Sequence, residues 1–211
     1  MKPYFQDDAV QIYLGDCREI LPSLPKVDLV LTDPPYGIAD VWKGGVGHGW
    51  GKARQEQVLR NQWDSKQPSE ELIAEVIDKA PLSIIWGGNY FNLPTSRCWL
   101  VYNKPERGFS LAEAELAWTN ASNVIRVCDA NRSDNGREHP TQKPIYLMEW
   151  CLTLSWSKDC NLILDPFMGS GTTLRAAKNL GRKAIGIEIE EKYCEIATRR
   201  MAQTVMNMEG I

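Results

Sequence analysis

The chain has 211 residues, of which 43% are hydrophobic and 24% charged. This is typical of a soluble globular protein with one domain, with or without a small insertion. No apolar run is long enough to span a membrane and the first residues contain no signal-peptide core, so we expect a cytoplasmic protein without membrane contact. The net charge of −3 argues against indiscriminate nucleic-acid binding, although a local basic face can coexist with it. Six cysteines without a C-x-x-C pair, and only two histidines, argue against a metal site.

The chain opens with a pattern typical of a β-α-β unit. Residues 10–14 alternate like a strand, residues 18–24 fit a short helix, and the apolar run 29–31 fits a buried strand of a parallel sheet. Asp16 and Asp33 therefore follow equivalent strand ends, where open α/β sheets bind their ligands. Taken alone, Asp16 could equally serve only to cap the helix that follows it.

The segment Asp33-Pro34-Pro35-Tyr36 follows the second of these strands. The two prolines fix the backbone and donate no N–H, so their carbonyls and the Asp33 carboxylate form a rigid group of acceptors. Tyr36 adds a flat ring suited to stacking. This combination predicts a site for a planar group that bears an NH2. The alternative is a strand followed by a proline turn and a surface tyrosine.

Residues 38–68 combine clustered glycines with tryptophans, a histidine, lysine and arginines, and show no periodicity. A loop of this length inside a compact domain is usually functional. We predict a mobile loop insertion whose rings and cations suit base stacking and phosphate contact. The alternative is an insertion without a role.

The middle of the chain continues the α/β pattern. A helix is expected after Pro68, with an apolar face formed by Leu72, Ile73, Val76 and Ile77. Strands are expected at 83–86, 98–102 and 114–119, the last two without a long helix between them and so paired antiparallel. Residues 120–138 are polar and turn-rich, which fits either a small target-recognition insert or a plain surface loop.

Lys143 lies in the segment His139-Pro140-Thr141-Gln142-Lys143-Pro144, directly before an expected helix at 145–154. Inward positions of this helix are expected at Leu147, Trp150 and either Cys151 or Leu154. The dipole of a helix disfavours a cation at its start, so we expect an anion close to Lys143.

The last third of the chain has the order strand, acid, glycine loop, helix, strand, acid. The strands are expected at 161–164 and 183–187, one helix from the end of the glycine loop through 175 to 180 and another at 193–201, and the acids are Asp165 and Glu188. Such an order is typical of a nucleoside-cofactor site, where the loop approaches the ligand and the second acid binds ribose hydroxyls. The loop lacks the Gly-Lys-Ser/Thr of a triphosphate-binding loop, and Leu174 replaces the third glycine of the dinucleotide fingerprint. A nucleoside that carries a carboxylate instead of a diphosphate fits better, and S-adenosylmethionine is such a molecule.

These motifs resemble those of the amino-group DNA methyltransferases, which methylate adenine N6 or cytosine N4. Asp33-Pro34-Pro35-Tyr36 and Asp165-Pro166-Phe167-Met168-Gly169-Ser170-Gly171 are similar to the two signature motifs of this family. His139 to Pro144 is similar to the motif before the cofactor loop in the permuted (beta) class, whose catalytic half comes first in the chain. The resemblance spans residues 13–197. It implies an α/β fold, the class I S-adenosylmethionine-dependent (Rossmann-like) sheet of seven strands, mostly parallel with one antiparallel strand.

The resemblance also implies roles for individual residues. Asp33, Pro34, Pro35 and Tyr36 would be catalytic, with Asp33 and the Pro34 carbonyl accepting hydrogen bonds from the amino group of a flipped base. Residues implied at the cofactor are Asp16, Cys17, Asp33, Thr141, Lys143, Asp165, Pro166, Phe167, Gly169, Ser170, Gly171, Thr172 and Glu188. In this assignment Glu188 meets the ribose and Asp16 the adenine amine, while Thr141 and Lys143 lie by the methionine carboxylate.

The expected substrate is double-stranded DNA, with adenine N6 favoured over cytosine N4 because Asp in the first motif is commoner among the adenine enzymes. RNA, a small molecule, and a silent DNA-binding module of the same fold are the alternatives. We expect a homodimer of bacterial or phage origin, with or without a paired restriction nuclease.

Overall fold

The structure is a computed structural model that describes residues 2–38, 66–104, 112–129 and 143–203. The predicted mobile loop at 38–68 lies almost wholly outside the described residues. The same holds for residues 130–138 of the expected insert and for Thr141.

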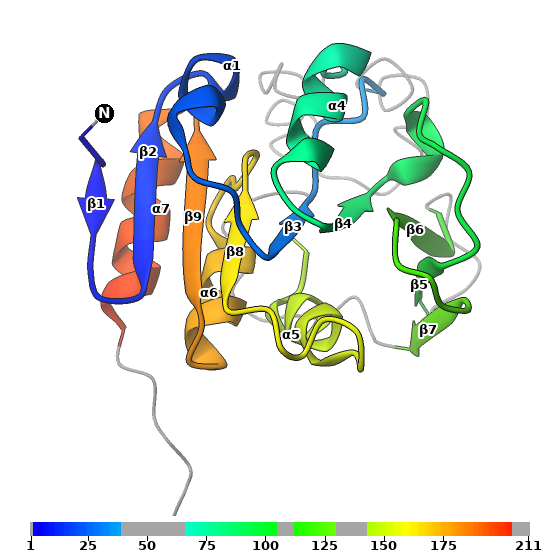
Figure 1. Ribbon diagram of the computed structural model, residues 1–211. Helices are drawn as coiled ribbons and strands as arrows, with labels where there is room; N and C mark the ends of the chain where they lie inside the picture. The colour runs from blue at the N-terminus through cyan, green and yellow to red at the C-terminus, as the bar shows by residue number, and fades with distance from the viewer. Residues whose placement is uncertain (1, 39–65, 105–111, 130–142, 204–211) are drawn as a thin grey trace, which may run out of the picture.

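The described residues form one mixed sheet of nine strands in the order β1-β2-β9-β8-β3-β4-β6-β5-β7 (Figure 1). The strands are β1 (Phe5–Gln6), β2 (Val10–Leu14), β3 (Leu29–Thr32), β4 (Leu82–Trp86), β5 (Trp99–Asn103), β6 (Ala114–Thr119), β7 (Arg126–Asp129), β8 (Leu162–Asp165) and β9 (Lys183–Glu188). Seven neighbouring strands in this order, β2-β9-β8-β3-β4-β6-β5, are the sheet that the sequence resemblance implies. Within them only β6 runs against its neighbours, β4 and β5.

The two edge strands were not expected. β1 pairs antiparallel with β2, so the described sheet contains two antiparallel strands, β1 and β6, where one was predicted. The antiparallel pairing of β1 with β2 is caused by a turn at Asp7. The Asp7 Oδ1 accepts hydrogen bonds from the N–H groups of Ala9 and Val10 at 2.8 and 2.7 Å, and the chain folds back there. At the other edge, residues 126–129 form β7, paired parallel with β5, where the sequence indicated an insert or loop. An edge strand needs partners on one side only, which is why so polar a segment can form one.

The permuted chain order places the C-terminal strands β9 and β8 between the N-terminal strands β2 and β3. β3 lies between β8 and β4, with Leu29 opposite Ile163 of β8. β2 lies beside β9, with Leu14 opposite Glu188. Because β2, β9, β8, β3 and β4 are parallel, their carboxyl ends share one edge of the sheet. The acids that follow β2, β3, β8 and β9 are thereby gathered from both ends of the chain.

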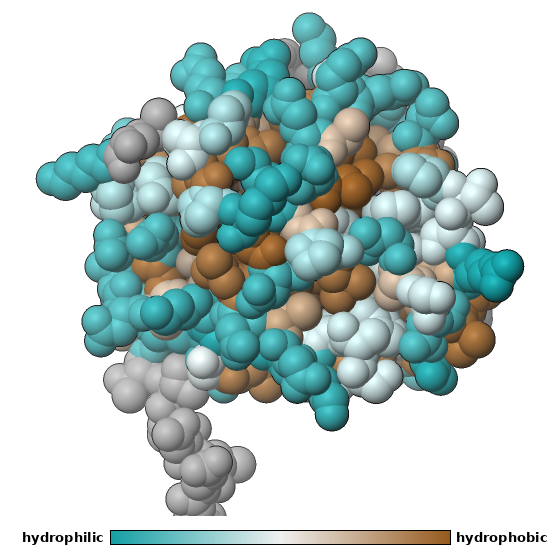
Figure 2. Space-filling view, viewed as in Figure 1, coloured by the Kyte–Doolittle hydropathy of each residue, from teal (hydrophilic) through white to brown (hydrophobic). Residues whose placement is uncertain are grey.

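Helices cover both faces of the sheet (Figure 1). One face carries α1 (Cys17–Ile20), the 3-10 turn η1 (Leu21–Ser23) and α4 (Glu70–Asp78), and the other carries α5 (Ile145–Thr153), α6 (Thr172–Asn179) and α7 (Glu191–Ala202). Alternate residues of each strand enter the two cores, as Leu29 and Leu31 do on one side and Val30 on the other. On the face shown in Figure 2, small apolar areas are separated by hydrophilic side chains.

Two helices differ from the sequence prediction. The helix expected at 18–24 is α1 followed by η1, because Pro22 has no N–H to continue an α-helix. In α5, Leu147 and Cys151 are buried as predicted, but Trp150 and Leu154 are only partly buried. Met148 and Leu152 take their places in the core, since α5 packs against α6 as well as the sheet. In α4, Leu72, Ile73 and Val76 are buried as expected and Ile77 is partly so.

Candidate active site and cofactor site

The segment Asp33 to Tyr36 leaves the carboxyl end of β3 and turns across the end of β4. Pro34 is buried, while Asp33, Pro35 and Tyr36 are partly buried. The Tyr36 ring lies so close to Gly87 that a Cβ there would be 2.0 Å from Tyr36 Cε1, and Gly87 has a φ of +68°. Only glycine allows this approach. The backbone at the end of β4 therefore fixes where the Tyr36 ring lies.

A second aromatic residue extends the ring of Tyr36. Tyr90 stacks on it with ring centroids 4.9 Å apart and planes 16° apart, and Phe91 meets it edge-on at 6.3 Å. The side-chain amide of Gln67 donates to the carbonyls of Tyr36 and Tyr90, at 2.8 and 3.0 Å. These partners of Tyr36 were not predicted. For Tyr90 and Phe91 the one available signal was the aromatic pair that follows β4 in the sequence.

Lys143 joins the catalytic segment through its ammonium group. Its Nζ donates to Asp33 Oδ2 at 2.7 Å and to Tyr36 Oη at 3.0 Å, and lies 2.9 Å from Glu115 Oε2. The Tyr36 hydroxyl donates to the other oxygen of Asp33, Oδ1. The anion expected near Lys143 is therefore present as two carboxylates of the protein itself. Glu115, on β6, was not predicted as a site residue.

Neighbouring charges in this group shift the pKa values of its members. Burial alone would lower the pKa of Lys143, but Asp33 and Glu115 raise it well above its usual value. Burial and the Asp33 carboxylate raise the pKa of Tyr36 well above its usual value. Burial would raise the pKa of Glu115, but Lys143 and Lys104 outweigh it and lower that pKa to about 2. At neutral pH Lys143 and Glu115 are therefore charged and Tyr36 is neutral.

Asp165 connects the catalytic segment to the glycine loop. It ends β8 and is buried, and its Oδ1 accepts hydrogen bonds from Thr32 Oγ1 at 2.7 Å and from the Phe167 N–H at 3.2 Å. Burial raises the pKa of Asp165 to about 6, against these hydrogen bonds. Since Thr32 directly precedes Asp33, this contact fixes the start of the loop relative to the catalytic acid.

The glycine loop passes over the end of β9 and enters α6. Glu188 Oε2 accepts a hydrogen bond from the Gly169 N–H at 3.0 Å, and burial raises the pKa of this carboxyl. Gly169 and Gly171 have φ values of +50° and +80°. A Cβ at Gly171 would lie 2.9 Å from Ala197 Cβ, whereas a Cβ at Gly169 would meet nothing within 4 Å. The loop is thus packed tightly against α7 at one glycine and open at the other.

Other predicted cofactor residues surround this loop. Pro166 is buried, Phe167 packs against the core beneath α1, and Thr172 opens α6. The buried Arg200, which sequence reasoning missed, donates from Nη1 to the Ser170 carbonyl at 3.1 Å.

Asp16 lies beside Glu188, because the neighbouring Gly15 N–H donates to the Glu188 carbonyl at 2.9 Å. Its side chain accepts a hydrogen bond from the Arg18 N–H at 2.9 Å and pairs with the Arg18 guanidinium, so the capping role is confirmed. Cys17 is buried, and burial raises the pKa of its thiol to about 11.

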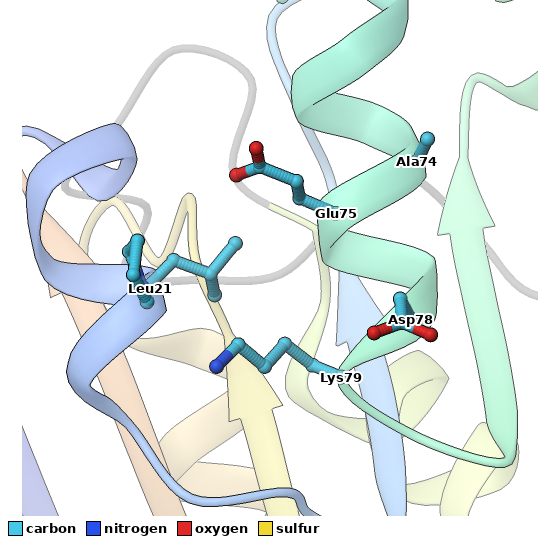
Figure 3. A pocket seen from close by; sticks show the side chains of 6 residues that line it. Leu21, Ala74, Glu75, Asp78 and Lys79 are labelled. Atoms are coloured by element: carbon cyan, nitrogen blue, oxygen red, sulfur yellow. The ribbon is translucent and has the colours of Figure 1, made fainter.

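A groove of about 420 Å³ lies elsewhere, between η1 and α4 (Figure 3). It is lined by Leu21, Pro22, Ala74, Glu75, Asp78 and Lys79. None of these belongs to the predicted site, and the Lys79 ammonium donates to the Leu24 carbonyl at 3.0 Å. Among the residues that the structure describes, no group of three or more His, Cys, Asp or Glu side chains is placed to hold a metal ion. No described helix is long and apolar enough to cross a membrane.

Comparison with known proteins decides the family. The N6/N4 DNA methylase family matches residues 77–199. The Type II methyltransferase M2.DpnII of Streptococcus pneumoniae is 53% identical over 95% of this chain and 92% of its own length. The chain belongs to the DNA methylase family. A second Type II methyltransferase, M2.LlaDCHI of Lactococcus lactis subsp. cremoris, is 31% identical to this methylase over 95% of the chain and 92% of its own length.

Solved structures show the fold of the methylase. The M1.HpyAVI–SAM complex has a TM-score of 0.60 at 24% identity and covers 92% of this chain and 100% of the other. The cytosine-N4-specific PvuII DNA methyltransferase has a TM-score of 0.62 at 18% identity and covers 98% of this chain and 91% of the other. The predicted class I methyltransferase fold is therefore confirmed. The family match includes Glu115, Lys143 and the glycine loop.

Proposed function

We propose that this methylase transfers a methyl group from S-adenosylmethionine to the exocyclic amino group of a base in double-stranded DNA, with adenine N6 as the preferred acceptor. One observation carries the proposal. Thr32 Oγ1 donates to Asp165 Oδ1 at 2.7 Å and so couples the strand that directly precedes Asp33 to the strand that leads into the glycine loop. Two such sites joined at adjacent strand ends suit a transfer between a nucleoside cofactor and a base.

The loop and its neighbours have the groups that S-adenosylmethionine requires. Space is open at Gly169, and the N–H groups at the start of α6 suit the methionine carboxylate. In this proposal Glu188 binds the ribose hydroxyls and Asp16 receives the adenine amine. Pro166, Phe167, Ser170, Gly171 and Thr172 shape the loop, and Thr141 and Cys17 complete the set implied by the family.

S-adenosylmethionine, held by the glycine loop, Glu188 and Asp16, would supply an electrophilic methyl group to the amino nitrogen of the base; its sulfur would leave with the C–S electron pair, and the proton lost from the nitrogen would pass to water. Because the amino group of a paired base is not accessible, the base must leave the stack. In the described state Asp33 Oδ1 accepts from the Tyr36 hydroxyl. A base amino group therefore reaches Asp33 by taking the place of that hydroxyl. Lys143 meanwhile keeps Oδ2 oriented at 2.7 Å.

The acceptors then act on charge that develops during the reaction. Asp33 and the Pro34 carbonyl accept hydrogen bonds from the amino group and stabilise the positive charge that grows on its nitrogen. The ring of Tyr36, extended by Tyr90, gives the base a stacking surface and fixes its direction of approach. No covalent bond to the protein is required.

The test incubates the purified methylase with isotope-labelled S-adenosylmethionine and unmethylated duplex DNA and identifies the labelled nucleoside by mass spectrometry. We expect labelled N6-methyladenine, lost in Asp33→Ala while the cofactor still binds in calorimetry. Asp7→Asn is the control, since Asp7 forms a partly buried ion pair with Lys178 away from the site. Labelled N4-methylcytosine would show that the acceptor is cytosine and not adenine. Full methylation by Asp33→Ala would refute the role of Asp33.

Matched RNA and DNA duplexes test the substrate, with label expected in DNA only. The homodimer and the cytoplasmic location implied by the resemblance also belong to this proposal. Light scattering on the purified protein, with an expected mass of about twice 23.9 kDa, tests the dimer.

A further inference from the structure

The group around Asp33 contains more charge than the proposed transfer uses. Lys143 Nζ lies 2.7 Å from Asp33 Oδ2 and 2.9 Å from Glu115 Oε2, and Lys104 Nζ pairs with Glu115 Oε1. Two carboxylates and two ammonium groups therefore alternate in one chain of contacts. The side chain of Lys143 is 6% exposed and that of Lys104 is 12% exposed, so water screens these charges weakly.

A buried cation beside Asp33 poses a problem for the chemistry. Methyl transfer to an amino group places positive charge on the nitrogen that Asp33 is proposed to receive. The Lys143 ammonium opposes that charge and competes for the Asp33 carboxylate, unless its own charge is neutralised. Glu115 is placed to do so, because its Oε2 lies 2.9 Å from the same ammonium nitrogen that Asp33 contacts.

We propose that Glu115 is a positioning residue for methyl transfer that acts through Lys143. It shares the Lys143 ammonium with Asp33, so that Lys143 orients Asp33 Oδ2 without cancelling the negative charge that the amino group requires. Glu115 reaches this place because β6 runs antiparallel between β4 and β5, which brings the first residues of β6 toward the end of β4 that lies under Tyr36. This inference rests on the proposed function.

The direct test replaces Glu115 by Gln, which keeps the shape of the side chain and removes its charge. We expect kcat for DNA methylation to fall about 10- to 100-fold, the effect of one uncompensated charge a few ångströms from the reacting nitrogen at a protein-like dielectric constant. The Kd for S-adenosylmethionine is expected to stay within about twofold of the parent value, since Glu115 has no place at the glycine loop. Asp7→Asn is the matched control, because Asp7 is 28% exposed and Glu115 25%, and each pairs with a lysine.

A second variant separates charge from structure. Glu115→Gln makes the group one charge more positive than in the parent, and adding Lys104→Met returns its net charge to the parent value. We expect the double variant to recover at least about fivefold of the lost kcat, whereas Lys104→Met in the parent gives no gain. If Glu115 served only to hold β6 in place, removal of its second partner would not recover activity.

The outcomes are distinct. A Glu115→Gln enzyme with parental kcat overturns the inference and leaves the proposed function intact. A loss of kcat that Lys104→Met does not recover assigns Glu115 a structural role and overturns it as well. Absence of methylation by the parent enzyme overturns the proposed function together with the inference.

Discussion

The proposed catalytic group, formed by Asp33, Tyr36, Lys143 and Glu115, and the glycine loop lie at the same edge of the sheet but are held together differently. Beyond its anchor at Thr32, the loop depends on residues closer in sequence, as when Glu188 accepts the N–H of Gly169 at 3.0 Å. The catalytic group depends on distant ones, since Lys143 is 110 positions from Asp33. Backbone conformation therefore defines the proposed cofactor side, whereas a set of buried and partly buried charges defines the side that is proposed to receive the base. Substitutions in the proposed catalytic group should therefore change kcat, and substitutions in the glycine loop should change the affinity for S-adenosylmethionine.

The largest separation is expected from Lys143→Met. It removes the ammonium shared by Asp33 and Glu115, so that Asp33 loses this counter-ion and Glu115 keeps Lys104, a change that costs about 3–5 kcal/mol when an ion pair is buried. We expect kcat to fall at least about 100-fold, because the acceptor geometry at Asp33 is lost. Thermal unfolding and single-turnover methylation measure both effects.

The same variant also decides to which side Lys143 belongs. Unchanged affinity for S-adenosylmethionine would place Lys143 in the catalytic group. A large loss of that affinity would instead support the contact with the methionine carboxylate that the family resemblance implies. Lys26→Met is the control, since Lys26 forms an exposed ion pair with Asp78.

The converse change is Gly171→Ala in the glycine loop. The new Cβ would lie 2.9 Å from Ala197 Cβ, at a φ of +80° that disfavours any side chain. We expect a loss of about 1–3 kcal/mol in the free energy of unfolding and a fall of about tenfold in affinity for S-adenosylmethionine. Chemical denaturation and calorimetry measure the two.

Gly181→Ala separates backbone strain from the clash, because Gly181 has a φ of +69° and open space around it. It should lose about 1 kcal/mol and bind the cofactor normally. Equal cofactor affinities in the two alanine variants would show that contact with α7 does not shape the loop.

The two regions were also unequally predictable from sequence. The seven strands other than β1 and β7, the Asp33 and Asp165 motifs and the order of the helices follow local patterns of polarity and glycine, and were predicted. Glu115 was not, because it appears in the sequence as one polar residue of an alternating strand. Its partner Lys143 is 28 positions away, and no local pattern connects them. The strand β1 was missed because its pairing depends on the turn at Asp7 and involves only two residues.

The pH dependence of stability should have opposite signs in the two regions. Asp165 has a pKa raised from 3.8 to about 6, so the native state binds a proton that the unfolded state has released. Its contribution is present below pH 3.8 and is lost as the pH rises to about 6, a change of up to about 3 kcal/mol. Glu115 has a pKa lowered from 4.5 to about 2, so its contribution is present above pH 4.5 and is lost as the pH falls toward 2.

Urea unfolding between pH 3 and pH 7 tests these signs against Asp165→Asn and Glu115→Gln. Relative to Asp165→Asn, the parent should lose stability as the pH rises from 4 to 6. Relative to Glu115→Gln, it should lose stability as the pH falls below 4.5. A stability difference that does not change with pH for either pair would show that the carboxyl in question titrates as in the unfolded chain.

The smallest expected effect concerns the outer ring of the catalytic group. Tyr90 is 41% exposed and stacks on Tyr36 at 4.9 Å, so Tyr90→Leu should lower the free energy of unfolding by only about 1 kcal/mol. Tyr4→Leu is the matched control, because Tyr4 is 40% exposed and directly precedes β1, an edge strand of the sheet. If Tyr90 extends the stacking surface for the base, Tyr90→Leu raises the KM for DNA about two- to fivefold and Tyr4→Leu does not, while both leave kcat and cofactor affinity near the parent values. Equal KM values in the two variants would confine Tyr90 to holding the Tyr36 ring, and would place the whole preference for a flat substrate on Tyr36 itself.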